Sequence, residues 1–425
     1  MDYLKRELLP LIGRHMNGSE IIAVTGARQT GKTTLCLHQI PEQTGLSADY
    51  ISFDDPDERF RFQKSAVSIL ESTEKPLVIL DEVQKAPFLF DPLKFVFDNL
   101  KMKTGKKKIF IITGSSQLLL MENIRETLAG RIALFNLYPF SLNETISGVE
   151  PPMLDSLWST QHLSSESLRR FETWPAKDVR RITAARNTHL RWGGFPPVWQ
   201  KTDEEGRAKW LKDYRKTYLE RDIADVGQVS SIDTFALVQK LLCARTAGIL
   251  SISEVARDAS VTVNTIKRYI SLLAMTYQCT LLRPFNENVS KRLIKSPKIY
   301  FNDTGLIGAI LGDTTISRGA LYESWVLSEL IKWKQRQLSD PKLYFYRTSA
   351  GLEIDFLIAA KNTLLPIEVK SGENVSSADG RSIEAFMKEY KKAARIGIVV
   401  YPGKEAVEIR KNIWAIPDLY LFGGI

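Results

Sequence analysis

Eight residues near the start of the chain read Gly26-Ala27-Arg28-Gln29-Thr30-Gly31-Lys32-Thr33 and match the pattern G-x-x-x-x-G-K-[ST]. The two glycines let backbone N–H groups converge on one phosphate, the lysine adds a charge for the β- and γ-phosphates, and Thr33 supplies a hydroxyl for Mg²⁺. The pattern predicts a phosphate-binding loop in which these eight residues and Thr34 contact the nucleotide. Arg28 and Gln29 receive no individual role.

The flanks of this loop have the pattern that such a loop requires. Residues 21–25 form a short apolar, β-branched run that predicts a strand, and residues 34–40 carry an apolar stripe at helical spacing. A strand, a loop and a helix in this order place a phosphate on the helix N-terminus. A chance match of a glycine-rich turn is the alternative, and it leaves these flanks unexplained.

A second apolar run, at residues 77–80, ends in two adjacent carboxylates, Asp81 and Glu82. A run this apolar suits a strand of a parallel sheet that is covered on both faces. At its carboxyl end we expect Asp81 to hold Mg²⁺ through water and Glu82 to polarise the water that attacks the γ-phosphate. The alternative is a buried strand followed by a solvated acidic turn.

A third strand is predicted at residues 108–113, and small polar residues follow it. We assign Ser115, with Thr113 as second choice, to contact with the γ-phosphate or the attacking water. Ordinary turn chemistry is the alternative. Farther along, Arg131 is a candidate arginine finger for a neighbouring subunit's nucleotide, against the alternative of a plain surface arginine.

These pieces resemble the AAA-type ATPases of bacteria and archaea. The segments that carry the resemblance are Phe53-Asp54-Asp55-Pro56, Leu80-Asp81-Glu82-Val83-Gln84, Thr113-Gly114-Ser115-Ser116, Leu128-Ala129-Gly130-Arg131, Gly193-Gly194-Phe195-Pro196 and Tyr218-Leu219-Glu220-Arg221-Asp222-Ile223. The resemblance covers most of the chain. It implies an ATPase module joined to a C-terminal region similar to restriction-endonuclease-like nucleases. The resemblance is more informative about the order of these parts than about a biological role.

Composition sets wider bounds. The 425 residues have room for two to four domains, and 44% hydrophobic with 25% charged residues is ordinary for a soluble protein. Apolar runs of 18 residues and a signal-peptide pattern are absent from the sequence, so we expect a cytoplasmic protein without membrane contact. The three cysteines and four histidines lack metal-ligand spacing, which predicts surface or lightly buried histidines and leaves Mg²⁺ on carboxylates as the expected metal.

The net charge is +9 and the isoelectric point is near 9.2. This balance favours a polyanionic partner such as DNA. The densest basic run, residues 101–108, is more simply explained as a solvated loop before a strand.

Strand and helix patterns alternate up to about residue 140, which predicts an α/β fold with a doubly wound parallel sheet and the nucleotide at its carboxyl edge. An irregular segment and then a helical stretch rich in Arg, Trp and Tyr follow. We therefore expect a P-loop AAA-type core at 1–148, an insert and helical lid at 149–235, a winged-helix domain at 236–310 and a small α/β restriction-endonuclease-like domain at 311–425.

Residues 250–273 predict a helix-turn-helix, with strands of a wing at 279–285 and 296–301. Capping residues begin both helices, and the apolar residues of the second helix recur at helical spacing. The residues that would face a DNA groove or phosphates are Thr262, Asn264, Thr265, Lys267 and Arg268. Packing against other protein parts is the alternative for this module, whereas the basic residues at 291–295 favour DNA.

The last third of the chain carries a second candidate catalytic set. Alternation places Glu353 and Asp355 on one face of a predicted strand, and Glu368 and Lys370 on one face of the next. If these strands pair as a hairpin, Asp355 and Glu368 can hold one Mg²⁺. Lys370 would then orient or deprotonate the attacking water and steady the charge that develops on the phosphate.

This D-x(n)-E-x-K arrangement resembles the PD-(D/E)xK nucleases, although Ile354 replaces the proline of that pattern. The resemblance implies a further metal ligand on a preceding helix, which is Glu323 here. A scaffold of this type can also be kept for binding alone, so cleavage stays open.

Taken together, the sequence predicts an ATP- and Mg²⁺-dependent ATPase that acts on DNA, assembled as a homo-oligomeric ring if Arg131 acts in trans. The alternative is a nucleotide-dependent switch whose C-terminal domains bind protein partners without nuclease activity. Sequence alone sets neither the subunit number nor the DNA structure that is recognised.

Overall fold

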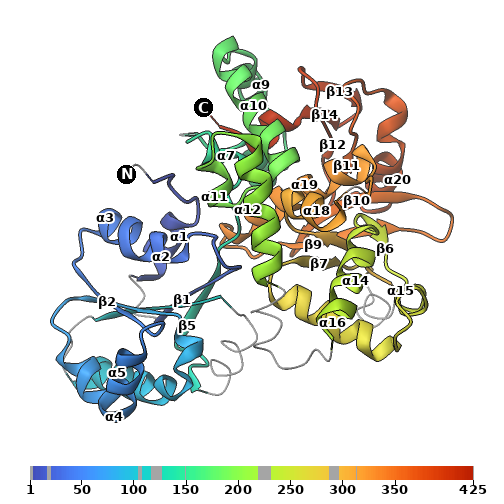
Figure 1. Ribbon diagram of the computed structural model, residues 1–425. Helices are drawn as coiled ribbons and strands as arrows, with labels where there is room; N and C mark the ends of the chain where they lie inside the picture. The colour runs from blue at the N-terminus through green and yellow to red at the C-terminus, as the bar shows by residue number, and fades with distance from the viewer. Residues whose placement is uncertain are drawn as a thin grey trace. The chain divides into compact units, whose positions relative to one another are not determined.

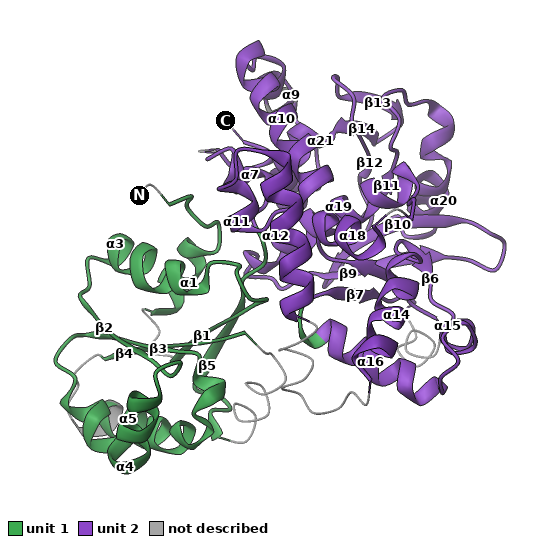
Figure 2. Ribbon diagram, viewed as in Figure 1, with its two compact units in different colours: residues 1–139, 275–277 green, residues 140–274, 278–425 purple. Residues whose placement is uncertain are grey.

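The computed structural model describes residues 3–16, 21–103, 108–115, 127–148, 150–218, 231–286, 296–312 and 314–424. The chain divides into two compact units, which Figure 2 colours separately. Unit 1 comprises residues 1–139 and 275–277, and unit 2 comprises residues 140–274 and 278–425.

Unit 1 contains a five-stranded sheet, of which Figure 1 labels β1, β2 and β5. The strand order is β2-β3-β4-β1-β5, and every neighbouring pair of strands is parallel. The strands are β1 (Ile21–Thr25), β2 (Ala48–Ser52), β3 (Leu77–Asp81), β4 (Ile109–Gly114) and β5 (Ile132–Asn136). Every residue of β1, β3 and β4 is buried, as expected for strands covered on both faces.

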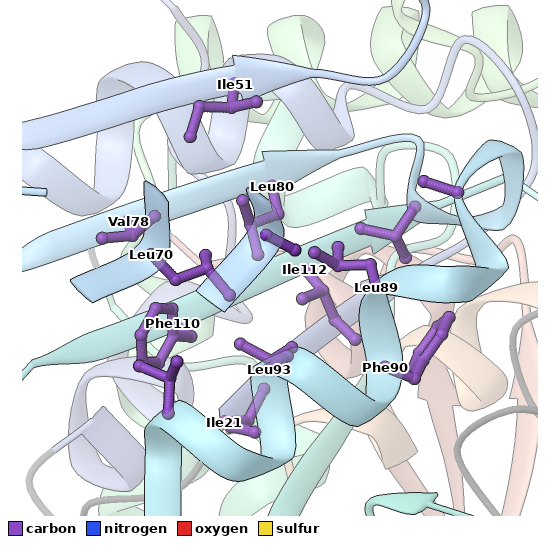
Figure 3. Close-up of a cluster of buried hydrophobic side chains, with 14 of the residues drawn as sticks. Ile21, Ile51, Leu70, Val78, Leu80, Leu89, Phe90, Leu93, Phe110 and Ile112 are labelled. Atoms are coloured by element: carbon purple, nitrogen blue, oxygen red, sulfur yellow. The ribbon is translucent and has the colours of Figure 1, made fainter. Parts of the chain in front are cut away.

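Helices cover both faces of this sheet because side chains alternate along its strands. Val78 and Leu80 of β3 point into one core, shown in Figure 3, while Ile79 points into the other. The first core is closed by α4 (Pro56–Ser72) and α5 (Phe90–Lys103). The second is closed by α1 (Leu9–Met16) and by the helix after the phosphate loop, which runs through α2 (Lys32–Thr34), a π-helical turn (Leu35–Gln39) and α3 (Ile40–Thr44). Two 3₁₀ turns, Val83–Lys85 and Pro87–Leu89, follow β3.

Unit 2 begins with a helical region. Its helices are α7 (Leu142–Thr145), α8 (Met153–Thr160), α9 (Ser165–Glu172), α10 (Ala176–Trp192), α11 (Pro196–Trp199), α12 (Glu204–Thr217) and α14 (Ile232–Cys243). Gly193 ends α10 with φ +76°, and a Cβ there would lie 2.0 Å from Asp303 Oδ1. The next residue, Gly194, donates its N–H to Asp303 Oδ2 (2.8 Å). Only glycine fits this turn, because the φ is left-handed and the carboxylate is close.

A helix-turn-helix and a small antiparallel sheet follow. The elements are β6 (Gly248–Ile249), α15 (Ile252–Asp258), α16 (Val263–Met275), β7 (Cys279–Leu282) and β8 (Lys298–Phe301), with the strands in the order β6-β8-β7. Thr262 Oγ1 accepts the Thr265 N–H (3.1 Å) and so caps α16, whose Ile266, Ile270 and Leu273 are buried. The predicted helices and wing strands are confirmed, while residues 291–295 lie outside the described part.

The C-terminal part of unit 2 holds a six-stranded mixed sheet in the order β13-β14-β12-β11-β10-β9. Its strands are β9 (Lys342–Arg347), β10 (Glu353–Ala360), β11 (Thr363–Val369), β12 (Gly397–Tyr401), β13 (Val407–Arg410) and β14 (Ile413–Pro417). The helices of this region are α18 (Thr304–Leu311), α19 (Arg318–Gln335), α20 (Arg381–Glu389) and α21 (Asp418–Phe422), with a 3₁₀ turn at Ser377–Gly380. Strands β9, β10 and β11 are antiparallel neighbours, which confirms the predicted hairpin of β10 and β11.

The predicted fold class is thus confirmed, whereas the four-part division stays a prediction. Of the basic run, residues 104–107 lie outside the described part, and Lys108 Nζ donates to the Leu70 and Thr73 carbonyls at the end of α4. The three cysteines are buried and free. The expectation of surface or lightly buried histidines is wrong for His189, which is only 1% exposed because α10 packs it against α7 and α11. Among the described helices, none is long and apolar enough to cross a bilayer.

Candidate functional sites

The predicted phosphate loop follows β1 and leads directly into α2. Gly26 has φ +152°, and a Cβ there would lie 2.1 Å from the Leu137 carbonyl oxygen, while Gly31 has φ +93°. Lys32 is almost fully buried, and its Nζ donates to the carbonyls of Gly26 (3.0 Å) and Ala27 (2.9 Å). Burial lowers the pKa of Lys32. The backbone of the loop therefore encloses the Lys32 ammonium group. Phosphate oxygens would bind this group more strongly than the two carbonyls do.

Asp81, at the end of β3, is the centre of a hydrogen-bond network that joins four chain segments. Its Oδ2 accepts hydrogen bonds from Thr33 Oγ1 (3.0 Å) and from the Tyr50 hydroxyl of β2 (2.6 Å). Its Oδ1 accepts one from Thr113 Oγ1 of β4. The predicted pair of Thr33 and Asp81 thus lies together, and Tyr50 adds a partner that the sequence pattern does not indicate.

Glu82 follows in a left-handed conformation, with φ +55°. Its N–H donates to Thr113 Oγ1 (3.2 Å), and its Oε2 accepts hydrogen bonds from Ser115 Oγ (3.3 Å) and from Gln84 Nε2. The Gln84 amide also donates to Ser115 Oγ (3.1 Å). Left-handed non-glycine residues cluster at functional sites, where neighbours hold them in place. Ser115 and Thr113 therefore lie beside the two candidate carboxylates, Asp81 and Glu82.

The strand before the loop is anchored by a residue from far along the chain. Thr25 Oγ1 lies 2.6 Å from the hydroxyl of Tyr277, which belongs to unit 1, and each hydroxyl oxygen lies 2.8 Å from Asn136 Oδ1, so the three groups share one hydrogen-bond network. On another side, the buried Arg6 donates to the Thr30 carbonyl (2.7 Å). The position of the loop thus depends on side chains before and long after it in the sequence.

Arg131 makes a two-pronged ion pair with Asp98 of α5. Its Nε lies 2.8 Å from Asp98 Oδ1, and its Nη2 donates to Oδ2 (3.0 Å). A role in a neighbour's nucleotide site would require this pair to open.

The second candidate set lies in unit 2, where carboxylates from three separate elements lie near one another. We name it the carboxylate centre, and its members are Glu323 of α19, Glu353 and Asp355 of β10, and Glu368 of β11. Asp355 Oδ2 accepts the Val369 N–H (2.9 Å), so the ends of β10 and β11 are joined by a side chain.

A lysine that the sequence prediction did not include lies among these carboxylates. Lys298 of β8 is only 5% exposed, and its Nζ is 2.7 Å from Glu353 Oε1, 3.4 Å from Glu323 Oε1 and 3.6 Å from Asp355 Oδ1. Burial alone would lower the pKa of Lys298, but the three carboxylates outweigh that effect and raise it. Tyr300, two residues along β8, donates its hydroxyl to Glu323 Oε1 (2.5 Å).

Glu368 of the centre pairs with Lys370, which lies beside it. Lys370 Nζ lies 3.1 Å from Glu368 Oε1 and 3.8 Å from Asp379. Burial, followed by the charge of Asp355, raises the pKa of Glu368 to about 8 and that of Glu323 to about 7. The centre therefore carries less negative charge at neutral pH than its four carboxyl groups would suggest.

The two sites differ in how well they fit a divalent metal. At the loop, Thr33 and Asp81 bring together the hard oxygen donors that Mg²⁺ takes, and ATP would supply the other oxygens. At the carboxylate centre, Glu368 Oε2 is buried and has no hydrogen-bond partner among the described residues. No three acidic, His or Cys side chains of the described residues are nevertheless arranged to hold a metal ion. The predicted metal set Glu323, Asp355 and Glu368 does not fit this arrangement, in which an ammonium group lies among the carboxylates.

Of the two residues that the sequence prediction missed, Lys298 has a weak sequence signal and Tyr50 has none. Lys298 is a charged residue within Pro297-Lys298-Ile299-Tyr300-Phe301, an otherwise apolar strand pattern, and a buried charge needs a partner. Tyr50 lies in β2, an edge strand of the sheet, and nothing in the local sequence pattern points to Asp81.

Comparison with known proteins agrees with the geometry of the loop. Residues 18–146 match a family model described as AAA domain. The N-terminal part of the chain is thus an AAA-type ATPase domain. Residues 183–317 and 318–420 match models described as domains of unknown function, DUF8612 and DUF4143 respectively.

Relatives of the whole chain occur in bacteria and archaea. The uncharacterized protein Rv2008c of Mycobacterium tuberculosis is 28% identical over 97% of this chain and 83% of its own length. The uncharacterized protein MJ1544 of Methanocaldococcus jannaschii is 24% identical over 88% of this chain and 79% of its own.

Similar solved structures include AMPPCP-bound DnaA from Aquifex aeolicus, at 17% identity and a TM-score of 0.26 over 64% of this chain and 89% of that one. The RuvB Holliday junction branch migration motor of Thermotoga maritima is 14% identical, with a TM-score of 0.26 over 67% of this chain and 94% of that one.

Proposed function

We propose that the chain is a Mg²⁺-dependent ATPase that couples ATP hydrolysis to an action on DNA. The observation that best supports hydrolysis is the network at the end of β3, where Thr33 and Asp81 share a hydrogen bond directly beside Glu82. Loop, metal-binding oxygens and a general-base carboxylate are the parts that γ-phosphate hydrolysis needs.

The roles follow from these contacts. Lys32 would exchange its two loop carbonyls for phosphate oxygens, and Thr33 with Asp81 would hold Mg²⁺. When bound, Mg²⁺ would neutralise charge on the phosphate oxygens. Glu82 would polarise the attacking water, and the hydrogen bonds from Ser115 and Gln84 orient its carboxylate for this task.

The DNA part rests on charge and on the helix-turn-helix. Thr262, Asn264, Lys267 and Arg268 are exposed at the start of α16, at the end of the helix that would enter a groove. The net charge of +9 favours the same partner.

ATP turnover with and without duplex, forked and single-stranded DNA at low salt tests this coupling. The proposal predicts stimulation that Lys267→Glu/Arg268→Glu abolishes. Lys177→Glu/Arg180→Glu on α10 makes the same charge change on other exposed residues and should leave stimulation as it is. Neither binding nor stimulation by any DNA would refute the coupling.

We further propose a ring in which Arg131 leaves Asp98 and reaches a neighbour's nucleotide. The exposed position of this pair, with both side chains about one-third accessible, supports such an exchange.

The second candidate is a nucleotide-dependent switch whose C-terminal domains bind protein partners. Lys298 favours it over a nuclease, because the ammonium group already compensates the carboxylates that would have to bind metal. This candidate predicts turnover that no DNA changes, and an Asp355→Ala variant without effect on DNA integrity.

A further inference from the structure

Lys298 differs from Lys370, the other lysine beside the carboxylate centre, in its burial and in the number of its carboxylate partners. Lys370 is one-third exposed and pairs with Glu368 at the rim, whereas Lys298 is buried and within 4 Å of three carboxylates. Its Nζ also lies 5.7 Å from the centre of the Phe345 ring. A buried ammonium group with this many partners is a fixed part of the interior and not a surface charge.

The position of Lys298 in its strand explains why its side chain stays among the carboxylates. Lys298 pairs with Ile249 of β6 and with Leu282 of β7, so its strand is the middle one of the small sheet. The Tyr300 hydroxyl on the same face donates to Glu323, so two side chains of this strand contact the centre. The side chain is therefore aimed by a hydrogen-bonded strand, and its withdrawal would leave three partly buried carboxylates without their common cation.

We infer that Lys298 is the resident cation of the carboxylate centre, which consequently recruits no divalent metal while Lys298 remains in place. The ion pairs of the centre then connect β8 of the small sheet with α19 and with β10 of the C-terminal sheet. An ammonium group and a divalent ion would compete for the same oxygens of Glu323, Glu353 and Asp355, and their like charges repel. This inference concerns unit 2 alone and does not depend on the proposed ATPase function.

Mn²⁺ binding to the full-length chain, followed by the electron paramagnetic resonance signal of free Mn²⁺, tests it. Wild type and Asp355→Asn should bind equal numbers of Mn²⁺ ions without nucleotide, because the centre holds none in either. Lys298→Met should gain one bound Mn²⁺, and Lys298→Met/Asp355→Asn should lose it again. Lys342→Met removes an exposed lysine that pairs with Asp340, and it should bind as wild type does.

Two results would overturn the inference. One is a Mn²⁺ ion that wild type binds and Asp355→Asn does not, which would show that the centre takes metal with Lys298 present. The other is a folded Lys298→Met chain that gains no Mn²⁺, which would show that Lys298 is not what excludes it. If Lys298→Met does not fold, Lys298→Gln replaces it in this test. The comparison of Mn²⁺ binding between wild type and Asp355→Asn tests the inference without any Lys298 variant. ATP turnover of the wild-type sample reports separately on the proposed function.

Discussion

The hydroxyl of Tyr50 donates a 2.6 Å hydrogen bond to Oδ2 of Asp81, the same oxygen that accepts from Thr33. Burial and this bond raise the pKa of Tyr50, so the phenol remains a donor at any physiological pH. A neighbouring strand thus fixes the orientation of the carboxylate that we propose as a metal ligand, which makes Tyr50 a positioning residue.

Tyr50→Phe should lower kcat for ATP hydrolysis by about tenfold or more, because a hydrogen bond to a charged group contributes about 1.5–3 kcal/mol. The loss should be partly recovered at high Mg²⁺ concentration, an effect that a simple folding defect would not show. Tyr346→Phe removes a comparable tyrosine bond to Glu389 in unit 2 and serves as the control. A Tyr50→Phe enzyme with wild-type kcat at all Mg²⁺ concentrations would contradict the positioning role.

The environment of His189 predicts how the free energy of unfolding depends on pH. Burial, followed by the charge of Lys332, lowers its pKa well below 6.5 in the folded state. Between that lowered value and about 6.5, the unfolded chain binds a proton that the folded chain does not. The free energy of unfolding should therefore decrease as the pH falls below about 6.5, by about 1.4 kcal/mol per pH unit, and be regained above it.

Denaturant unfolding of the full-length chain between pH 5 and pH 8 measures this dependence. His189→Gln should weaken it, while His162→Gln, which changes an exposed histidine, should not. Equal slopes in wild type and His189→Gln would show that other groups govern the acid response.

Arg131 gives a test of the ring that we propose. Mixtures of Lys32→Ala and Arg131→Ala subunits should hydrolyse ATP faster than either variant alone, because some interfaces combine an intact loop with an intact arginine. Asp98→Ala breaks the same ion pair but keeps the arginine, so it should retain more activity than Arg131→Ala. If mixing restores nothing and the two variants lose activity equally, Arg131 serves only its pair with Asp98.

Local patterns were enough to predict the loop, the two carboxylates at the end of β3 and the hairpin of β10 and β11. Each of these features lies within a short segment whose glycines, apolar run or alternation report its structure directly. The same holds for the helix-turn-helix, where Thr262 caps α16 as its position in the sequence indicates.

Contacts between distant segments could not be predicted in this way. Tyr50 reaches Asp81 because β2 and β3 are neighbours in the sheet, and Tyr277 reaches Thr25 across some 250 residues. Lys298 meets Glu323 and Asp355 because β8, α19 and β10 converge, which is a property of the tertiary fold. A sequence motif identifies candidate metal ligands by their spacing. It does not show whether a residue from another part of the chain already compensates their charge.

The proposal that this chain hydrolyses ATP is tested most directly by comparing wild type with Glu82→Gln in two assays, nucleotide binding and phosphate release. Glu71→Gln, on the exposed side of α4, controls for the loss of a carboxylate. The predicted result is that Glu82→Gln binds ATP about as tightly as wild type but releases phosphate at least about 100-fold more slowly. Phosphate release by Glu82→Gln at the wild-type rate, with ATP bound equally well, would contradict the role of Glu82 and the mechanism built on it.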